Sequence, residues 1–148
     1  MAKKLAIVFG VVFVLVGAMG MIGTGIVGPM GLFETNSIHD IVHLLIGIVL
    51  LGVAFMSPAS SGTWLKVFGV VYLAIAVLGF LLVPSGGELL GLVHTNAADH
   101  LLHIVLGIVL YVAGMMGGKG MQGAPMAQAP APAPMPSSSD SSSMGGTM

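Results

Sequence analysis

Residues 5–27 read LAIVFGVVFVLVGAMGMIGTGIV and contain no Asp, Glu, Lys or Arg. An α-helix rises about 1.5 Å per residue and the hydrocarbon core of a bilayer is about 30 Å thick, so about 20 apolar residues span it. This stretch reaches that length without help from its neighbours. It predicts a transmembrane helix, and it decides the class of fold.

Three further stretches without charged residues follow, at residues 41–56, 67–83 and 101–116. Each becomes long enough to span a bilayer when the turn before it is added, which brings in residues 37–40, 63–66 and 97–100. The sequence therefore predicts an all-α polytopic membrane protein. Four spans joined by short loops favour an up-down-up-down bundle of transmembrane helices.

The composition of the whole chain agrees with this prediction. Of its 148 residues, 56% are hydrophobic and 6% are charged, and the mean hydropathy is +1.07. Soluble domains carry about a quarter charged residues, so the expected surroundings are a lipid bilayer. A net charge of -1 provides no basic surface, which excludes nucleic acid as a partner. The chain has no cysteine, so disulfides and thiolate chemistry are excluded as well.

The few charged residues are sorted between the two sides of the predicted bundle. All four basic residues fall on one side, and the other side carries four carboxylates and every histidine. The basic residues are Lys3, Lys4, Lys66 and Lys119, and the opposite group is Glu34, Asp40, Glu88, Asp99, His39, His43, His94, His100 and His103. The positive-inside rule then places both termini of the expected multi-pass membrane protein in the cytoplasm.

The sequence also contains an internal repeat. Residues 31–36 (GLFETN) and 43–50 (HLLIGIVL) recur at an offset of 60 as residues 91–96 (GLVHTN) and 103–110 (HIVLGIVL), and residues 8–13 (VFGVVF) recur at an offset of 59 as 67–72 (VFGVVY). We expect two tandem helix-hairpin repeats in parallel orientation, at about residues 5–56 and 64–116. The first span is the counterpart of the third, so we interpret it as retained rather than cleaved as a signal peptide.

Small and polar residues at matching places in the repeats have structural interpretations. Glycines within the spans are expected where helices approach closely; they are Gly10, Gly17, Gly47, Gly69 and Gly107. Asn36 and Asn96 precede the second and fourth spans, where an asparagine side chain caps a helix well.

Residues 117–148 form a tail rich in Met, Ala, Pro and Ser. Such a segment has too little apolar surface to offset the entropy of ordering, so we expect a disordered cytoplasmic tail. The four-helix domain is expected to end at residue 116.

The residues best suited to ligand binding or proton transfer lie at the start of the second and fourth spans. Spacings of three and four place them on one helical face; they are His39, Asp40, His43, Asp99, His100 and His103. One interpretation is that they form hydrogen bonds between helices and fix the bundle. A second is that they bind a divalent metal, for which imidazole and carboxylate are suitable ligands. In a third, His43 and His103 are axial ligands of a haem or members of a proton relay.

The repeated pattern G-L-x-x-T-N, followed after six residues by H-x-x-x-G-I-V-L, with F-G-V-V-F/Y early in each repeat, resembles a bacterial family of small four-span membrane proteins. That family is catalogued as domain of unknown function 4383. The resemblance covers about residues 5–116 and omits the tail. It implies the fold and a bacterial origin, and it brings no activity, cofactor or catalytic residue with it.

No motif of an enzyme accompanies these features, since the chain has no G-x-S-x-G, P-loop or dinucleotide fingerprint. We therefore expect no enzymatic activity and no cofactor, and a structural or accessory membrane protein. Its external His/Asp cluster would stabilise the bundle or bind a membrane-protein partner or a second copy of the chain. The alternative is a metal- or haem-binding membrane protein that uses His43 and His103.

Overall fold

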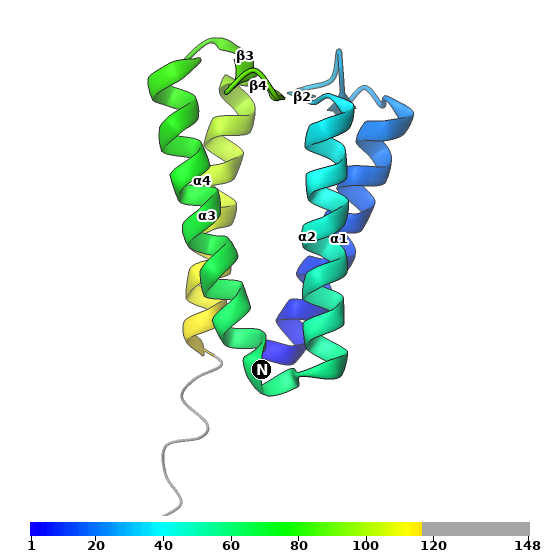
Figure 1. Ribbon diagram of the computed structural model, residues 1–148, viewed down its shortest axis with the longest axis vertical. Helices are drawn as coiled ribbons and strands as arrows, with labels where there is room; N and C mark the ends of the chain where they lie inside the picture. The colour runs from blue at the N-terminus through cyan, green and yellow to red at the C-terminus, as the bar shows by residue number, and fades with distance from the viewer. Residues whose placement is uncertain (117–148) are drawn as a thin grey trace, which may run out of the picture.

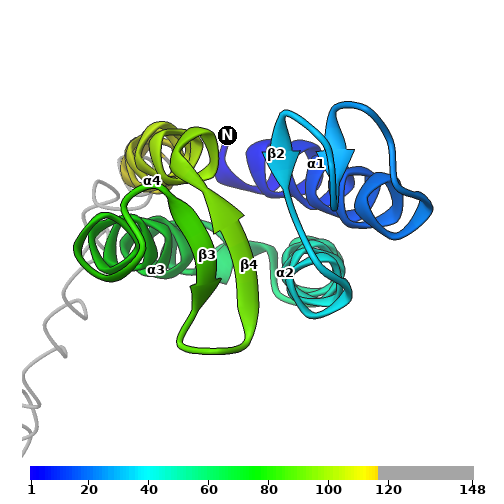
Figure 2. The same cartoon turned by 90° about the horizontal axis from the view of Figure 1, so that it is seen from above.

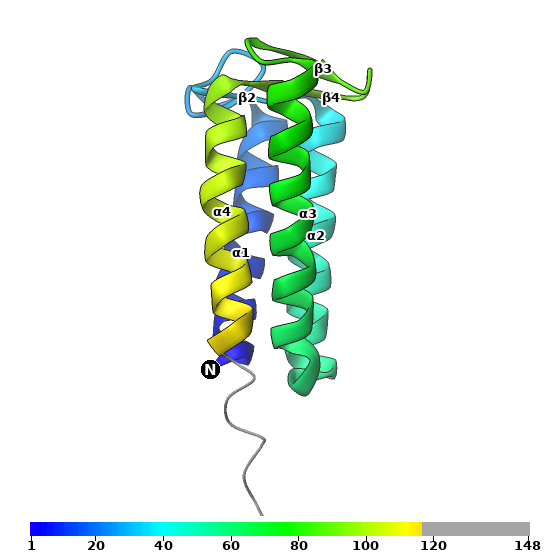
Figure 3. The same ribbon diagram turned by 90° about the vertical axis from the view of Figure 1, so that its left-hand side faces the viewer.

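Four long helices make up most of residues 1–116, which are the residues that the structure describes. In this computed structural model they are α1 (Ala2–Ile22), α2 (Ser37–Met56), α3 (Ser61–Leu82) and α4 (Ala97–Met116), with a short 3-10 turn η1 (Pro58–Ser60) before α3. All four are long and apolar enough to cross a membrane, which confirms the predicted all-α fold. Figures 1 and 3 show them running side by side along the long axis. The predicted disordered tail lies outside the described residues.

Glycine and asparagine set several of the helix ends. α1 ends at Gly23, which adopts the left-handed conformation (φ 75°, ψ 76°) and donates its N–H to the carbonyls of Met19 and Gly20. At the start of α2, the side-chain oxygen of Asn36 accepts the backbone N–H of His39 at 3.0 Å. Asn96 accepts the corresponding N–H at the start of α4 at 3.0 Å. Both asparagines therefore lie at the N-caps that the sequence suggested.

The helices pair as two antiparallel hairpins, α1 with α2 and α3 with α4, which stand on opposite sides of Figure 1. Backbones touch within each hairpin. A Cβ built on Gly47 would lie 2.7 Å from the carbonyl oxygen of Gly10, and one on Gly69 would lie 2.8 Å from that of Gly107. Gly17 faces the carbonyl of Asp40 in the same way, at 2.6 Å. The glycines of the spans thus lie at contacts inside a hairpin, where a side chain would push the helices apart.

The two hairpins meet along a narrow apolar core. Its most buried side chains are Phe13, Leu50, Leu65, Tyr72 and Leu110. The opposite faces of the helices carry exposed Val, Leu and Ile, including Val8, Leu45, Val70 and Ile108. In a bilayer such faces contact acyl chains, so the distribution of apolar residues fits a membrane-spanning bundle.

Short strands cover the end of the bundle opposite the N-terminus, which we call the loop end (residues 23–36 and 83–96; Figures 1 and 2). β1 (Val27–Gly28) pairs in parallel with β2 (Phe33–Glu34), and β3 (Gly86–Leu89) pairs antiparallel with β4 (Val93–Asn96). These strands were not predicted from the sequence, because segments of two to four residues are too short to show a period-two pattern.

Candidate metal centre

Three histidines from two hairpins converge just below the loop end. His39 and His43 come from the first two turns of α2 and His103 from α4, and all three are buried. One ring nitrogen from each lies within 4.8 Å of the others. The ring centroids of His39 and His43 are 4.6 Å apart, and that of His103 is 5.8 Å and 6.2 Å from them. We call these residues the histidine cluster.

Two members of the cluster are oriented by backbone carbonyls. The Nδ1 of His39 donates to the carbonyl of His94 at 2.9 Å, and the Nδ1 of His103 donates to the carbonyl of Asp99 at 2.6 Å. Because a carbonyl only accepts, each Nδ1 carries the proton and each neutral ring keeps a lone pair on Nε2. Metal-binding histidines are commonly held by such bonds from the nitrogen that does not bind the metal.

The third member, His43, is held by packing instead of hydrogen bonds. Its Nδ1 is buried and has no hydrogen-bond partner among residues 1–116. Its ring stacks on Phe13 with a centroid distance of 5.9 Å and an interplanar angle of 9°, and Tyr72 stacks on His103 at 5.0 Å. Neither aromatic residue was predicted from the sequence to belong to the site. The signal was present, because Phe13 and Tyr72 occupy matching places in VFGVVF and VFGVVY.

The other three sequence-predicted ligands are placed elsewhere. The carboxylate of Asp40 lies against Gly20 of α1, and the ring of His100 lies against Gly79 of α3. His100 also donates its Nε2–H to the carbonyl of Val83 at 2.9 Å. Oδ2 of Asp99 accepts the backbone N–H of Asn96 at 2.9 Å. The structure therefore groups His39, His43 and His103 and leaves Asp40, Asp99 and His100 in contacts with a neighbouring helix or a helix start.

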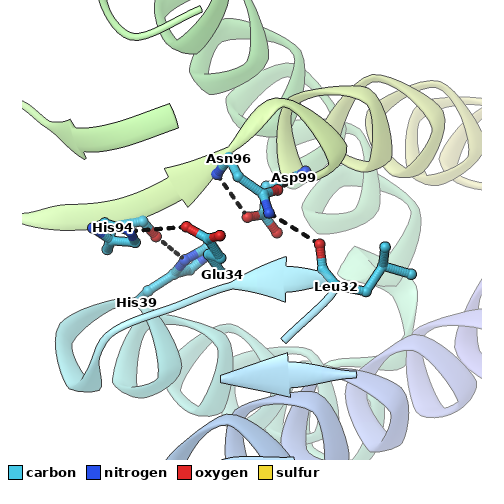
Figure 4. Close-up of polar contacts among 6 residues, drawn as sticks. All are labelled: Leu32, Glu34, His39, His94, Asn96 and Asp99. Carbon is cyan, nitrogen blue, oxygen red and sulfur yellow. Dashed lines mark hydrogen bonds and ion pairs between the residues drawn. The ribbon is translucent and has the colours of Figure 1, made fainter. Parts of the chain in front are cut away.

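Hydrogen bonds join the two hairpins at the loop end, and Figure 4 shows the one between Asn96 and Leu32. The Asn96 side chain donates to the carbonyl of Leu32 at 3.0 Å, and Asn36 donates to the carbonyl of Leu92 at 2.9 Å. These bonds are reciprocal, since each asparagine reaches the loop of the opposite hairpin. Each also caps its own helix, so helix starts and the hairpin interface are fixed by the same side chains.

An ion pair extends the same network at its edge. Nε2 of His94 lies 3.1 Å from Oε2 of Glu34, and both side chains are partly exposed. The backbone carbonyl of His94 is the one that holds His39, so this pair is connected to the cluster through a single residue (Figure 4). The sequence analysis placed Glu34 and His94 on the same side of the membrane but did not pair them.

Four apolar helices in two hairpins, with histidines buried between them, define a small polytopic membrane protein. The chain belongs to the family described as domain of unknown function 4383, whose sequence profile matches residues 3–116. The resemblance identified from the repeated motif is therefore confirmed. Comparison with curated proteins and with solved structures found no match.

Proposed function

We propose that this protein is a membrane protein that binds a divalent first-row transition metal through His39, His43 and His103. The supporting observation is the convergence of a ring nitrogen from each to within 4.8 Å in a buried site. The buried Nδ1 of His43 has no hydrogen-bond partner among residues 1–116, and a bound cation would satisfy a buried lone pair of this kind. Imidazole suits zinc, copper, iron and nickel, so the ligand set favours this group of metals over magnesium or calcium.

The spacing of the three rings is compatible with an ion between them. A metal about 2.0 to 2.1 Å from each nitrogen, in tetrahedral geometry, needs nitrogens about 3.4 Å apart. The three nitrogens, which lie within 4.8 Å of one another, would have to approach by up to about 1.4 Å for one ion to bind all three. Asp40 and Asp99 are buried in the same turns of α2 and α4, and their carboxylates would offset the charge of the ion.

A haem is a less suitable occupant than a metal ion. A macrocycle bound by His43 and His103 would need open space beside both rings. Phe13 and Tyr72 stack on those rings and contact each other at a centroid distance of 5.3 Å. The packing therefore favours a compact ligand.

A second function is favoured by the hydrogen bonds between the hairpins. The bonds made by Asn36, Asn96, His39 and Glu34 all join one hairpin to the other at the loop end. In this alternative the protein is structural or accessory, and these polar side chains stabilise its bundle. It then binds no metal and has no enzymatic activity. A membrane-protein partner or a second copy of the chain would then contact the loop end.

For the setting of the site we propose a bacterial inner membrane, with the loop end outside and both termini in the cytoplasm. Lys3, Lys4 and Lys66 support this orientation, because they lie near the end opposite the loop end. We further propose that the two hairpins derive from a repeated unit, since residues sixty positions apart make corresponding contacts. Asn36 and Asn96 are the clearest example.

Metal binding is tested on the full chain purified in detergent, first freed of metal and then titrated with Co²⁺ and Zn²⁺. We expect one ion per chain, and a visible Co²⁺ spectrum typical of a site with nitrogen ligands. His43→Leu and His103→Leu should abolish binding. His100→Leu is the matched control, because His100 is equally buried on α4 but faces Gly79. Equal binding by all variants, or no binding by the wild type, would support the structural alternative.

A further inference from the structure

Two cavities lie on either side of the histidine cluster. The first, between α2 and α3, has a volume of about 130 Å³ and is lined by all three cluster histidines together with Tyr72 and Thr95. The second, between α1 and α4, has a volume of about 190 Å³ and is lined by two of the histidines with Thr35 and Asp99. We call them the α2–α3 cavity and the α1–α4 cavity. The cluster therefore borders a cavity on each side.

Two hydroxyl groups that have no partner among residues 1–116 line the α2–α3 cavity. Tyr72 and Thr95 are each 1% exposed, and neither hydroxyl finds a hydrogen-bond partner within the described part of the chain. Buried hydroxyls are normally hydrogen-bonded, to protein or to an ordered water, so these two are available to a molecule in the cavity. The remaining lining residues are mostly Val, Ile and Leu, so the two hydroxyls and the histidines are the polar groups that a ligand there would meet.

A metal held by three imidazoles has room for such a ligand. Three protein ligands plus one exchangeable position is the arrangement of zinc sites that bind water or substrate, whereas structural zinc sites use four protein ligands. All three histidine ligands of the proposed metal line the α2–α3 cavity. The α1–α4 cavity is lined by the carboxylate of Asp99, which would repel an anionic ligand. The α2–α3 cavity is therefore the better place for a small donor molecule.

We propose that the metal centre is open, and that it binds a small exogenous donor ligand in the α2–α3 cavity. Tyr72 donates its O–H to this ligand and Thr95 provides a second hydrogen bond. The ligand class comprises water, hydroxide and small anions that carry a lone pair for the metal. This proposal rests on the metal site proposed above and adds to it the fourth ligand, its cavity and two residues that recognise it.

The test uses the full-length, Co²⁺-loaded protein in detergent, with azide as the probe. Azide should shift the visible bands of the bound Co²⁺ in a saturable titration. Failure of Co²⁺ to bind would contradict the metal site itself. Normal Co²⁺ binding with a spectrum that azide does not change would leave the metal site standing and overturn the open position.

Two variants test the hydroxyls. Tyr72→Phe should weaken azide binding about tenfold, the effect of losing a hydrogen bond worth about 1.4 kcal/mol. The substitution is structurally mild, because the matching position of the first hairpin is Phe13. Thr95→Val should weaken azide binding also, whereas Thr35→Val, which alters the α1–α4 cavity, should not. Unchanged affinity in Tyr72→Phe would overturn its role, and equal losses in both threonine variants would overturn the choice of cavity.

Discussion

The carboxylate of Asp40 on α2 packs directly onto the backbone of Gly20 on α1, in the place that a side chain at position 20 would occupy. The same relationship recurs in the other hairpin, where the ring of His100 on α4 packs onto Gly79 of α3. A polar group near the start of one helix therefore requires a glycine near the end of its partner. This requirement explains why neither Asp40 nor His100 joins the histidine cluster, since each is directed toward its own hairpin.

Gly20→Ala should destabilise the protein, because its methyl group would overlap the Asp40 carboxylate in a buried contact. We expect the free energy of unfolding to fall by about 1–3 kcal/mol, the usual cost of overpacking. The measurement is denaturant unfolding in detergent micelles. Gly52→Ala is the control: a methyl group there meets no atom of residues 1–116 within 4 Å, so stability should be unchanged or slightly higher. Equal effects at the two positions would contradict this account of the hairpin contact.

Asn36 makes two separable contributions to stability. Asn36→Ala removes both the cap of α2 and the bond to Leu92, so we expect a loss of about 1–3 kcal/mol. Asn36→Asp keeps an oxygen that caps the helix but removes the donor to the Leu92 carbonyl. This variant should lose about 0.5–1.5 kcal/mol, measured by the same unfolding experiment. If Asp proved as damaging as Ala, the bond between the hairpins would be the main contribution and the cap a minor one.

Much of the fold follows from the sequence, because a span in lipid must be apolar along its whole length and helical to satisfy its backbone. The offset of 60 also places corresponding residues of the two hairpins in corresponding contacts, as with Asn36 and Asn96. From the sequence, the candidate metal site could be predicted only as a set of six possible ligands. Helical spacing puts His39, Asp40 and His43 near one face, but it does not say which side chain meets the facing hairpin and which meets its own.

The contacts between the loops could not be predicted from the sequence in the same way. The ion pair of Glu34 with His94 depends on how two loops sixty residues apart approach each other, which no local pattern records. Tyr72 illustrates a different limit. Its place in the repeat matches that of Phe13, but the sequence does not show that its hydroxyl is buried beside the cluster without a partner among residues 1–116.

The Glu34–His94 pair should contribute little to stability by itself. Its side chains are 38% and 35% exposed, and partly exposed ion pairs are typically worth about 0.2–1 kcal/mol. A double-mutant cycle with Glu34→Gln and His94→Gln, measured by unfolding in detergent at pH 6, should give a coupling energy in this range. The coupling should disappear in 1 M salt, where the Debye length is about 3 Å. A coupling of several kcal/mol that resists salt would show that the pair is more deeply desolvated than its exposure indicates.

The orientation of the bundle can be tested through its lysines. Lys3, Lys4 and Lys66 are charged groups near the end opposite the loop end, and the bias in Lys and Arg sets the direction of insertion. A reporter that is active only outside the cytoplasm should be active when fused at residue 30 or 90 and inactive when fused after Lys119. Replacing Lys3 and Lys4 by glutamine should reduce the fraction of correctly oriented protein, because two of the four basic residues are lost. Activity of the fusion after Lys119 in the wild type would reverse the orientation and place the histidine cluster near the cytoplasmic face.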